Sequence, residues 1–491
     1  MVFFLAISKF LSSIPRMKNN KKIFWFSIFL FAAIFCYHLF SSAFDHDEIQ
    51  HLHATWLVSQ GALPFTDFLE QHNPTLWYLF APVLQLASGT EVIFIVRTFD
   101  VLLLAASLFF IWKILRSFFD QSLSRWLILL TMSCFMFTRN MLEFRPDPFM
   151  TFFILVSYFF WIKTFREQKR KDALVSGLAI GLATVILQKA LVFLLLMLGM
   201  WGVAFLFAPF WMFERKKIFA QASIFFVALL FPLLIFFIFI LEQGHFDDYW
   251  FWNVTFNKFF YLQAMVSAHI SWVSTVSRSF AQSGLVWVLG FLGAFVVCVQ
   301  QRRNFSLLSL FFISLLYFVG FMRSGFPLAQ YLLPFFPVLI LFSGFAWQFL
   351  EKQHRRFQFF LPLLVLLTLI ESFAIMILYQ KNTFQLQCMN HVLETTKQND
   401  VVMIQPPFHP IFRNDASFFW YNNNIIMKAV SDYAKKYGGE NKGEKDVKRV
   451  RENLPAVLRK TAHAEDKIYP DLEVYFKNYK PMGKYDLYRL R

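Results

Sequence analysis

Charge is scarce in this chain, and the shortage decides its class. Only 16% of the 491 residues are charged, whereas 57% are hydrophobic and 69 are phenylalanine. A soluble protein of this length does not need so much apolar surface. The composition therefore excludes an ordinary soluble domain and indicates an integral membrane protein.

Cysteines and nucleotide-binding motifs are also scarce. The four cysteines are scattered, and they form neither a disulfide framework nor a metal-ligand spacing. The chain has no Walker loop and no dinucleotide fingerprint, which disfavours ATP-driven transport and a nucleotide-sugar fold. The net charge of +16 does not indicate a nucleic-acid partner, because the cations gather in loops between apolar segments and in the tail.

Long apolar segments are abundant. A helix needs about 20 apolar residues to span a bilayer, and eleven segments are candidates, although those at 126–138, 148–162 and 173–187 are short. The first segment follows basic residues, as in a signal peptide, but it has no clear cleavage site and we expect it to be retained. The others are 91–112, 190–212, 218–241, 284–300, 304–320, 327–350 and 357–379, after the first at 23–43.

Basic residues lie in alternate loops between these segments. Clusters at 113–125, 163–171, 215–217 and 302–303 share one side of the membrane, which the positive-inside rule makes cytoplasmic. Residues 44–90 contain no lysine or arginine and fall on the opposite, outer side. The N-terminus is therefore expected to be cytoplasmic.

The first outer loop, residues 44–90, is expected to fold. Ile49, Leu52 and Trp56 follow helical spacing, and Gly61 is a natural C-terminal cap for that helix. A second stretch, 73–88, is apolar but too short to span. We expect two interfacial helices at the outer membrane surface.

The tail becomes polar after the last apolar segment. Strand-like runs, DVVMIQ and YDLYRL, alternate with helical stretches, and residues 435–453 read as a solvated segment. The predicted fold is thus an α-helical polytopic membrane protein: a transmembrane domain at 1–379, followed by a small C-terminal α/β domain at 380–491 on the outer side.

Three acids stand at the start of the first outer loop: Asp45, Asp47 and Glu48. Asp45 with Glu48, or Asp47 with Gln50, matches a helix capping box. One cap needs one acid, however, and a carboxylate beside lipid headgroups can also act as a general base or help to hold a divalent cation. Both interpretations stay open on spacing alone.

Cations occur on the same side. Asp147 is placed to cap the next helix with Pro148 in its first position, which leaves Arg145 to snorkel, to bind a lipid phosphate or to pair with a first-loop acid. Lys189 interrupts an apolar run and is either an anchor or a phosphate ligand. Further candidates follow at Arg323, Gln330 and Tyr331.

A metal site is a weaker possibility in the same loop. Glu70 and His72 are two residues apart and combine a carboxylate with an imidazole, and Asp45 and Asp47 would supply further ligands. The sequence allows a divalent ion, Mg²⁺ or Mn²⁺, but does not require one. His51 and His53 are expected on the surface of the interfacial helix, and Arg97 is expected to face the helix bundle. The aromatic stretch 247–261 is expected to form an interfacial belt or the wall of a groove.

Four motifs in this order resemble the multi-spanning GT-C glycosyltransferases: DHDEIQHLHATWLVSQGALPFTDFLEQHNPTLWYLFAP, FRPDPFM, LQKALVFL and QYLLPFFPVLILFSG. The most similar groups are the protein O-mannosyltransferase-like enzymes and the lipid A aminoarabinose transferase. The resemblance covers most of residues 23–379, and the tail is similar to the outer domain of bacterial members.

The resemblance implies a polyprenyl-phosphate sugar donor and transfer with inversion on the outer, periplasmic side of a bacterial inner membrane. It implies that Asp47, in the acidic pair Asp47–Glu48, is the catalytic base and that Asp147 is the second outer-loop acid. We expect Glu48 to orient the acceptor or to support Asp47. Arg145, Lys189 and Arg323 would hold the phosphate. The aminoarabinose transferases carry Glu-Lys-Pro where this chain reads EQHNP; the lysine is absent, and His72 or Lys189 would replace it.

The acceptor stays open among envelope glycolipids such as lipid A or core oligosaccharide, other glycans, and proteins. A transporter or flippase for lipid-linked sugars is the alternative function, since it would use the same cations without chemistry. A flippase is expected to place charges or broken helices near mid-membrane, whereas here the polar outliers lie at one edge. A non-catalytic scaffold is less consistent with the acid cluster.

Overall fold

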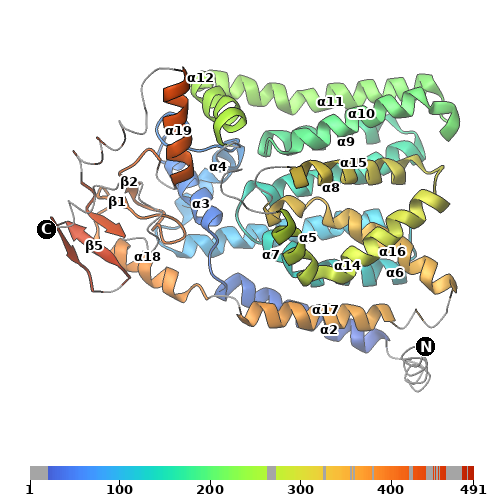
Figure 1. The fold of residues 1–491 in the computed structure, drawn as a ribbon, viewed down its shortest axis with the longest axis horizontal. Coiled ribbons are helices and arrows are strands. Elements are labelled where there is room, and N and C mark those ends of the chain that lie inside the picture. The colour runs from blue at the N-terminus through green and yellow to red at the C-terminus, as the bar shows by residue number, and fades with distance from the viewer. Residues whose placement is uncertain are drawn as a thin grey trace.

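The computed structural model describes residues 20–261, 272–323, 328–353, 357, 360–378, 381–419, 424–437, 446, 448, 450, 452, 454–459, 478–483 and 485–490. Helices dominate it (Figure 1). The predicted fold class is confirmed, because a helical bundle is joined to a small C-terminal sheet with its own helices.

Every predicted apolar segment overlaps a helix, although the segment 327–350 contains η4 (Ala329–Leu332) before its main helix begins at Phe336. Six of the helices in the described part of the chain are long and apolar enough to cross a membrane, namely α2, α5, α8, α11, α14 and α15. The set is α2 (Asn20–Ser41), α5 (Glu91–Arg116), α6 (Gln121–Ser133), α8 (Pro146–Glu167), α9 (Arg170–Ile186), α10 (Ala190–Leu206), α11 (Arg215–Glu242), α14 (Trp272–Gln300), α15 (Phe305–Arg323), α16 (Phe336–Gln353) and α17 (Phe360–Leu378).

Small residues allow the helices of the bundle to approach closely. A Cβ atom at Gly177 of α9 would lie 2.3 Å from the backbone oxygen of Phe225 in α11. At Gly293 of α14 it would lie 1.7 Å from that of Phe342 in α16. Membrane helices associate through such close packing, because lipid offers no hydrophobic driving force between them. Large side chains on outer faces, such as Phe219 and Phe231, stay exposed in the structure, as expected of surfaces that meet lipid.

The first outer loop folds over one end of the bundle. It contains α3 (His46–Ser59), α4 (Thr75–Phe80) and the 3-10 helix η1 (Ala81–Leu86). Gly61 has a φ of 90°, the left-handed conformation expected just after a helix end. The prediction of two helices is confirmed, but α3 does not lie on a surface: residues on all its faces are buried, including His51 and His53. The prediction that these two histidines are exposed was wrong, because the loop and the C-terminal part cover the polar face of α3.

The C-terminal part forms a five-stranded sheet in the order β2-β1-β3-β5-β4. The strands β1, β2 and β3 run parallel, and β4 and β5 are antiparallel to their neighbours. The two strand-like runs predicted from sequence contain β1 and β5. Most of the polar segment 435–453 lies outside the described residues. The elements are α18 (Thr383–Thr395), β1 (Val401–Met403), β2 (Asn414–Asp415), α19 (Asn424–Tyr437), β3 (Val457–Arg459), β4 (Tyr479–Pro481) and β5 (Leu487–Leu490).

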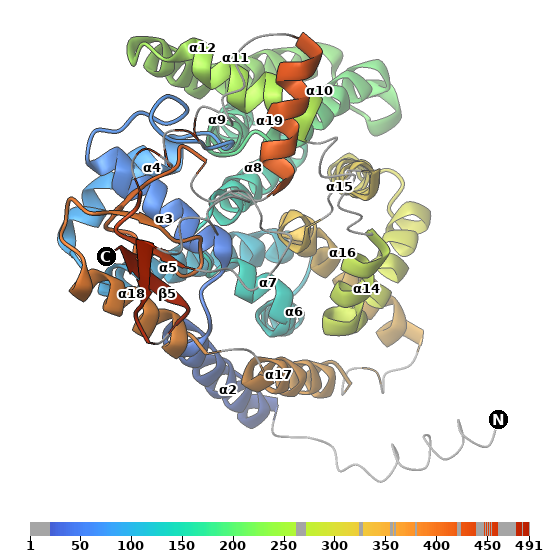
Figure 2. The same ribbon diagram turned by 60° about the vertical axis from the view of Figure 1, so that its left-hand side comes forward.

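The C-terminal sheet lies at the same end of the bundle as α3 and α4 (Figures 1 and 2). The Gln385 side chain of α18 accepts the Phe44 backbone N–H at 2.8 Å and donates to the Phe44 carbonyl at 3.0 Å. These bonds fix the start of the first loop just before its acids. Short elements complete the chain: α7 (Phe135–Asn140), η2 (Ala208–Trp211), α12 (Phe246–Tyr249), the π-helix η3 (Trp250–Tyr261) and η4 (Ala329–Leu332).

Candidate active site

The acid cluster begins with a capping box. Asp45 caps α3 by accepting the Asp47 backbone N–H at 3.0 Å, and Glu48 accepts the Asp45 N–H at 3.4 Å. Of the two predicted pairs, the Asp45–Glu48 pair is therefore the one that forms. The cap leaves Asp47 in the first turn, with 36% of its side chain exposed.

Glu48 is bound by an arginine from a neighbouring helix. Its two carboxylate oxygens accept Arg97 Nε at 2.6 Å and Arg97 Nη2 at 2.7 Å, and both side chains are buried. Arg97 Nη1 also donates to the Leu39 carbonyl at the end of α2, at 3.0 Å. Arg97 thus faces the bundle, as predicted. Such a two-pronged pair fixes orientation as well as supplying energy, so it locks α3 against α2 and α5.

Arg145 joins the other two acids. Its Nη2 atom lies 2.6 Å from Asp45 Oδ1 and 2.8 Å from Asp47 Oδ2, while Nη1 lies 3.5 Å from Glu143 Oε2. Arg139 also contacts Glu143, at 3.2 Å. Of the interactions proposed for Arg145, pairing with a first-loop acid is the one that the structure contains.

This pairing changes the acidity of the cluster. Burial alone raises the pKa of the Asp47 carboxyl, but Arg145 and then His46 outweigh it and hold that pKa well below its usual value. Burial raises the pKa of Glu143 to about 7, and the negative charge of Asp45 adds to the rise against Arg139 and Arg145. Asp47 is therefore ionised at neutral pH, whereas Glu143 changes its charge there.

Lys189 lies beside a third acid. It occupies the N-cap position of α10, and its ammonium is 3.2 Å from Asp147 Oδ1 and 3.8 Å from the centre of the Tyr331 ring. Burial lowers the pKa of Lys189, but Asp147 and Tyr331 outweigh it and raise the pKa above its usual value. A quarter of the side chain, 26%, remains exposed, so this cation can still meet an anion.

Asp147 does not cap its helix as predicted. α8 begins at Pro146, the N-cap residue is Arg145, and Asp147 stands in the first turn. Pro146 takes the first position because its fixed φ suits a helix start and its missing N–H has no partner to lose there. The Asp147 carboxylate, freed from capping, pairs with Lys189.

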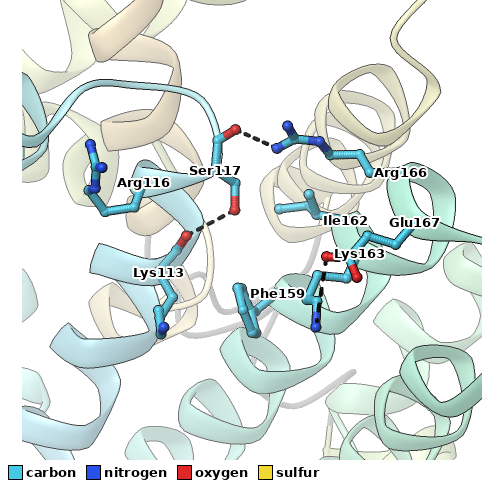
Figure 3. Close-up of a pocket in the computed structure, with 8 residues that line it drawn as sticks. All are labelled: Lys113, Arg116, Ser117, Phe159, Ile162, Lys163, Arg166 and Glu167. Atoms are coloured by element: carbon cyan, nitrogen blue, oxygen red, sulfur yellow. Dashed lines mark hydrogen bonds and ion pairs between the residues drawn. The ribbon is translucent and has the colours of Figure 1, made fainter. Parts of the chain in front are cut away.

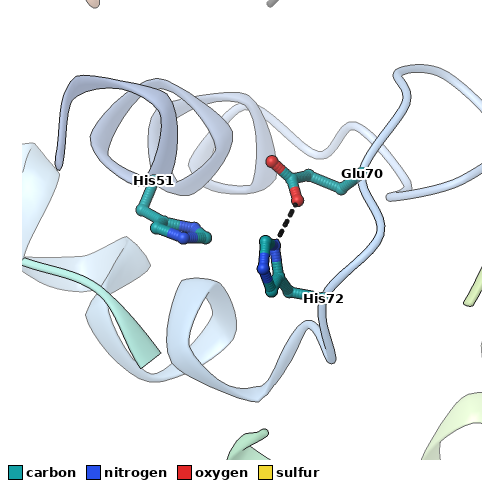
Figure 4. A group of neighbouring side chains, drawn as sticks. All are labelled: His51, Glu70 and His72. Atoms are coloured by element: carbon teal, nitrogen blue, oxygen red, sulfur yellow. Dashed lines mark hydrogen bonds and ion pairs between the residues drawn. The ribbon is translucent and has the colours of Figure 1, made fainter. Parts of the chain in front are cut away.

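His51, Glu70 and His72 come together in the first loop (Figure 4). His72 Nδ1 lies 3.1 Å from Glu70 Oε2, and the rings of His51 and His72 are 5.0 Å apart. The Trp77 indole, which can only donate, gives its N–H to His51 Nδ1 at 3.1 Å, so the neutral ring carries its proton on Nε2. Burial and then His72 hold the pKa of His51 well below its usual value, and the charges of Asp47, Arg145 and Lys189 also act on it.

Hydrogen bonds to α9, α12 and η3 hold the segment that carries Glu70 and His72. Asn73 Nδ2 donates to the Thr184 carbonyl at the end of α9 at 3.0 Å, and Tyr249 Oη donates to Asn73 Oδ1 at 3.2 Å. Asn257 Nδ2 of η3 donates to the Gln71 carbonyl at 2.9 Å. The aromatic stretch 247–261 therefore supports the candidate site through Tyr249 and Asn257. Elsewhere it lines a surface pocket with Tyr433.

A second histidine and acid cluster lies between α3 and the C-terminal sheet. His53 Nε2 is 2.9 Å and His409 Nε2 is 3.1 Å from the same oxygen of Asp415, and His53 Nδ1 is 2.6 Å from the Ile411 carbonyl oxygen. Burial, with His409 next, lowers the pKa of His53 to about 4. Sequence reasoning missed this cluster, and no local pattern signals it.

The remaining predicted residues have mixed outcomes. Tyr331 of η4 contacts Lys189, and its neighbour Gln330 is buried. Arg323 ends α15, but its side chain lies outside the described part of the structure. Asp45 and Asp47 are bound to Arg145, apart from the group that Glu70 and His72 form with His51. Asp100 of α5 was missed; it is buried three residues after Arg97, and an acid within an apolar segment is the signal that marks it.

Comparisons with known proteins bear on this arrangement. Residues 71–236 match the family model described as dolichyl-phosphate-mannose-protein mannosyltransferase. A search of curated protein sequences found no match. The matched range runs from the first outer loop to α11 and includes Arg145, Asp147 and Lys189.

Two solved structures share the fold. ArnT from Cupriavidus metallidurans, bound to undecaprenyl phosphate, is 10% identical with a TM-score of 0.62, over 94% of this chain and 97% of that one. The archaeal oligosaccharyltransferase AglB from Archaeoglobus fulgidus, in complex with an inhibitory peptide and a dolichol-phosphate, is 12% identical with a TM-score of 0.54, over 78% of this chain. This chain covers 59% of the length of AglB. The predicted resemblance to multi-spanning glycosyltransferases is confirmed.

Proposed function

We propose that this protein is an inverting glycosyltransferase that moves a sugar from a polyprenyl-phosphate donor to a hydroxyl of an envelope glycolipid, glycan or protein. The family-model match and the shared fold support the reaction class. The observation that carries the assignment within this chain is the ionised, partly exposed Asp47 carboxylate, fixed by Arg145 at 2.8 Å.

Asp47 is the general base in this proposal. Its carboxylate takes the proton of the acceptor hydroxyl while the hydroxyl oxygen forms a bond to the anomeric carbon from the face opposite the phosphate. The bond between the anomeric carbon and the phosphate oxygen breaks, and the electron pair leaves with the polyprenyl phosphate. Attack from the opposite face inverts the anomeric configuration. Glu48 is fully buried against Arg97, so of its two expected roles only the support of Asp47 fits.

Lys189 is the cation best placed to hold the donor phosphate. Among the described residues it pairs with one acid, Asp147, and it is partly exposed, whereas Arg145 is buried among three acids. An ammonium aimed at the phosphate stabilises the charge that grows on the leaving group. We therefore assign Arg145 to positioning Asp47. Arg323, Gln330 and Tyr331 would complete the phosphate end of the site.

The proposed reaction needs no metal. A divalent ion in this region would be held by His51, Glu70 and His72, where it would neutralise phosphate charge. Two imidazoles and one carboxylate do not suit Mg²⁺, which prefers oxygen ligands. Glu70 is also already satisfied: its oxygens accept the Gln50 amide and the Gln71 backbone N–H, beside His72.

The proposed location is a bacterial inner membrane, with the N-terminus in the cytoplasm and the site and C-terminal domain in the periplasm. The alternation of basic loops supports this orientation. The donor would enter laterally from the outer leaflet, because the candidate site lies at the bundle end that the first loop covers.

The test compares envelope glycolipids and glycoproteins by mass spectrometry in a strain that lacks the gene. The strain would be complemented at matched expression with wild-type protein, Asp47→Asn, or the control Asp67→Asn, an exposed acid in the same loop that accepts the Leu63 N–H. We expect the deletion and Asp47→Asn to lack one sugar mass that the other two strains contain. Full restoration by Asp47→Asn would favour a flippase, because transport of a lipid-linked sugar needs no general base.

A further inference from the structure

A basic pocket lies at the bundle end opposite the candidate site. It has a volume of about 230 Å³ and is formed between the last turns of α5 and α8 (Figure 3). Lys113 and Arg116 line one wall, and Lys163 and Arg166 line the other. Phe159 and Ile162 supply apolar surface beside them, and Glu167 is the one acid in the lining.

The positive charge in this pocket is only partly compensated. Lys163 pairs with Asp172 at 3.3 Å and lies 3.9 Å from Glu167, whose other oxygen binds Lys169. The other three cations form no ion pair with any carboxylate in the described residues. Arg116 donates to the Phe119 carbonyl at 2.8 Å, Arg166 donates to that of Ser117, and Lys113 lies over two aromatic rings.

A solvated basic rim would account for scattered cations, since positive charge is favourable at helix C-termini and in cytoplasmic loops. Scattered cations repel one another and spread apart. Here the cations of two helices instead face the same cavity, and two guanidinium groups are fixed by backbone carbonyls. A cavity with fixed, uncompensated cations is a binding site for an anion with several acceptor oxygens.

The level of the pocket along the membrane-spanning helices indicates which class of anion it binds. α5 and α8 are both candidate membrane spans and both end here, which places the cations at the level of the lipid headgroups. Below them, α5 exposes Leu102 and Phe109 on its outer surface. A molecule with a phosphate above and hydrocarbon below matches both levels.

We propose that this pocket binds the phosphate headgroup of an anionic membrane lipid and thereby clamps α5 to α8. The two helices carry both fixed pairs of the candidate site at their other ends, because Arg97 of α5 holds Glu48 and Arg145 at the start of α8 holds Asp47. The bound headgroup therefore stabilises the spacing of these helices from the opposite face of the membrane. The binding itself does not depend on the proposed reaction.

The experiment measures lipid retention on the full-length protein. Wild-type protein and variants would be taken from vesicles of phosphatidylcholine with a minor fraction of phosphatidylglycerol, and bound lipid would be counted by native mass spectrometry. For Lys113→Gln/Arg116→Gln, we expect roughly thirtyfold weaker retention of phosphatidylglycerol and unchanged retention of phosphatidylcholine. The matched control is Lys216→Gln/Lys217→Gln, which removes the same charge from the first turn of α11 outside the pocket.

Two outcomes would overturn the proposal. Equal retention by the wild-type and Lys113→Gln/Arg116→Gln proteins would mean that the pocket binds no lipid. Displacement of the lipid by inorganic phosphate at a one-to-one ratio would identify free phosphate as the ligand. The single variant Lys113→Gln guards against misfolding, since in the described part of the chain the Lys113 side chain has only ring contacts to lose. We expect it to weaken retention roughly fivefold.

Discussion

Arg145 and Asp47 are 98 residues apart in sequence, yet Arg145 Nη2 lies 2.8 Å from Asp47 Oδ2. The same nitrogen holds Asp45 at 2.6 Å, so a single guanidinium joins the start of α3 to the start of α8. The pair sets the direction in which the Asp47 carboxylate points. It also ties the geometry of the candidate base to the packing of the membrane helices.

The variant Arg145→Lys tests whether Arg145 positions the Asp47 carboxylate. A lysine keeps the charge but lacks the rigid guanidinium fork, which holds Asp45 and Asp47 through Nη2 and Glu143 through Nη1. We expect kcat to fall by about 10²-fold with a nearly unchanged KM for the donor, because a misplaced base slows the chemical step. Steady-state kinetics with a polyprenyl-phosphate sugar would measure both constants. A raised donor KM with normal kcat would instead make Arg145 a phosphate ligand. Arg139→Lys is the matched control, because Arg139 is more exposed and contacts Asp45 and Glu143.

The variant Glu48→Gln tests whether the ion pair between Glu48 and Arg97 holds α3, the helix that carries Asp47. The substitution removes the carboxylate that pairs with the buried Arg97 guanidinium, and breaking a buried ion pair in this way typically costs about 3–5 kcal/mol. We expect a clear drop in the thermal unfolding midpoint in detergent, together with reduced activity. Glu91→Gln provides the control, since Glu91 is exposed and accepts the nearby Gly89 backbone N–H. An unchanged midpoint for Glu48→Gln would show that the pair with Arg97 does not hold α3 in place.

Local patterns allowed much of the fold to be predicted. Apolar runs mark helices because a bilayer requires them to be apolar along their whole length, and the capping box at Asp45 depends on residues three apart. The partners of the charges were not predictable in the same way. Whether Arg145 meets phosphate or Asp47 depends on how α8 packs against a loop far away in sequence, and the spacing of residues within a segment does not contain that information. His53 and Asp415 illustrate the same limit, because a fold must bring them together before either looks unusual.

We expect the titration of Glu143 to make donor binding depend on pH. Its folded pKa is about 7, above its ordinary value, so Glu143 is largely neutral below pH 7 and becomes negative as the pH rises through 7. That extra negative charge lies beside Arg145 and opposes an incoming phosphate. We expect the donor KM to rise as the pH passes about 7, and the rise to vanish in Glu143→Gln. A rise that persists in Glu143→Gln would assign the titration to another group.

Chelation tests whether the first-loop cluster needs an ion. Because Glu70 is satisfied by Gln50, the Gln71 N–H and His72, we expect the purified enzyme to keep its activity after dialysis against EDTA. The measurement is the initial transfer rate before and after chelation, with metal content determined on the same samples. The opposite outcome is that EDTA removes the activity and that Mn²⁺ restores it in wild-type protein but not in His72→Ala. That outcome would show that the cluster is a metal centre and would require a revised mechanism.

We expect protonation of His53 to weaken the contact between α3 and the C-terminal sheet in acid. Its folded pKa of about 4 lies below the ordinary 6.5, so the unfolded chain takes up the proton first as the pH falls. The stability that this group contributes is present above about pH 6.5 and is lost toward pH 4, by up to roughly 3 kcal/mol. Thermal unfolding across this range should show a steeper acid decline in wild-type protein than in His53→Gln, which cannot titrate. His391→Gln serves as the control, because His391 lies on α18 away from this cluster. Identical declines in wild-type and His53→Gln proteins would mean that protonation of His53 does not weaken the contact, and that Asp415 or another carboxylate governs the acid response.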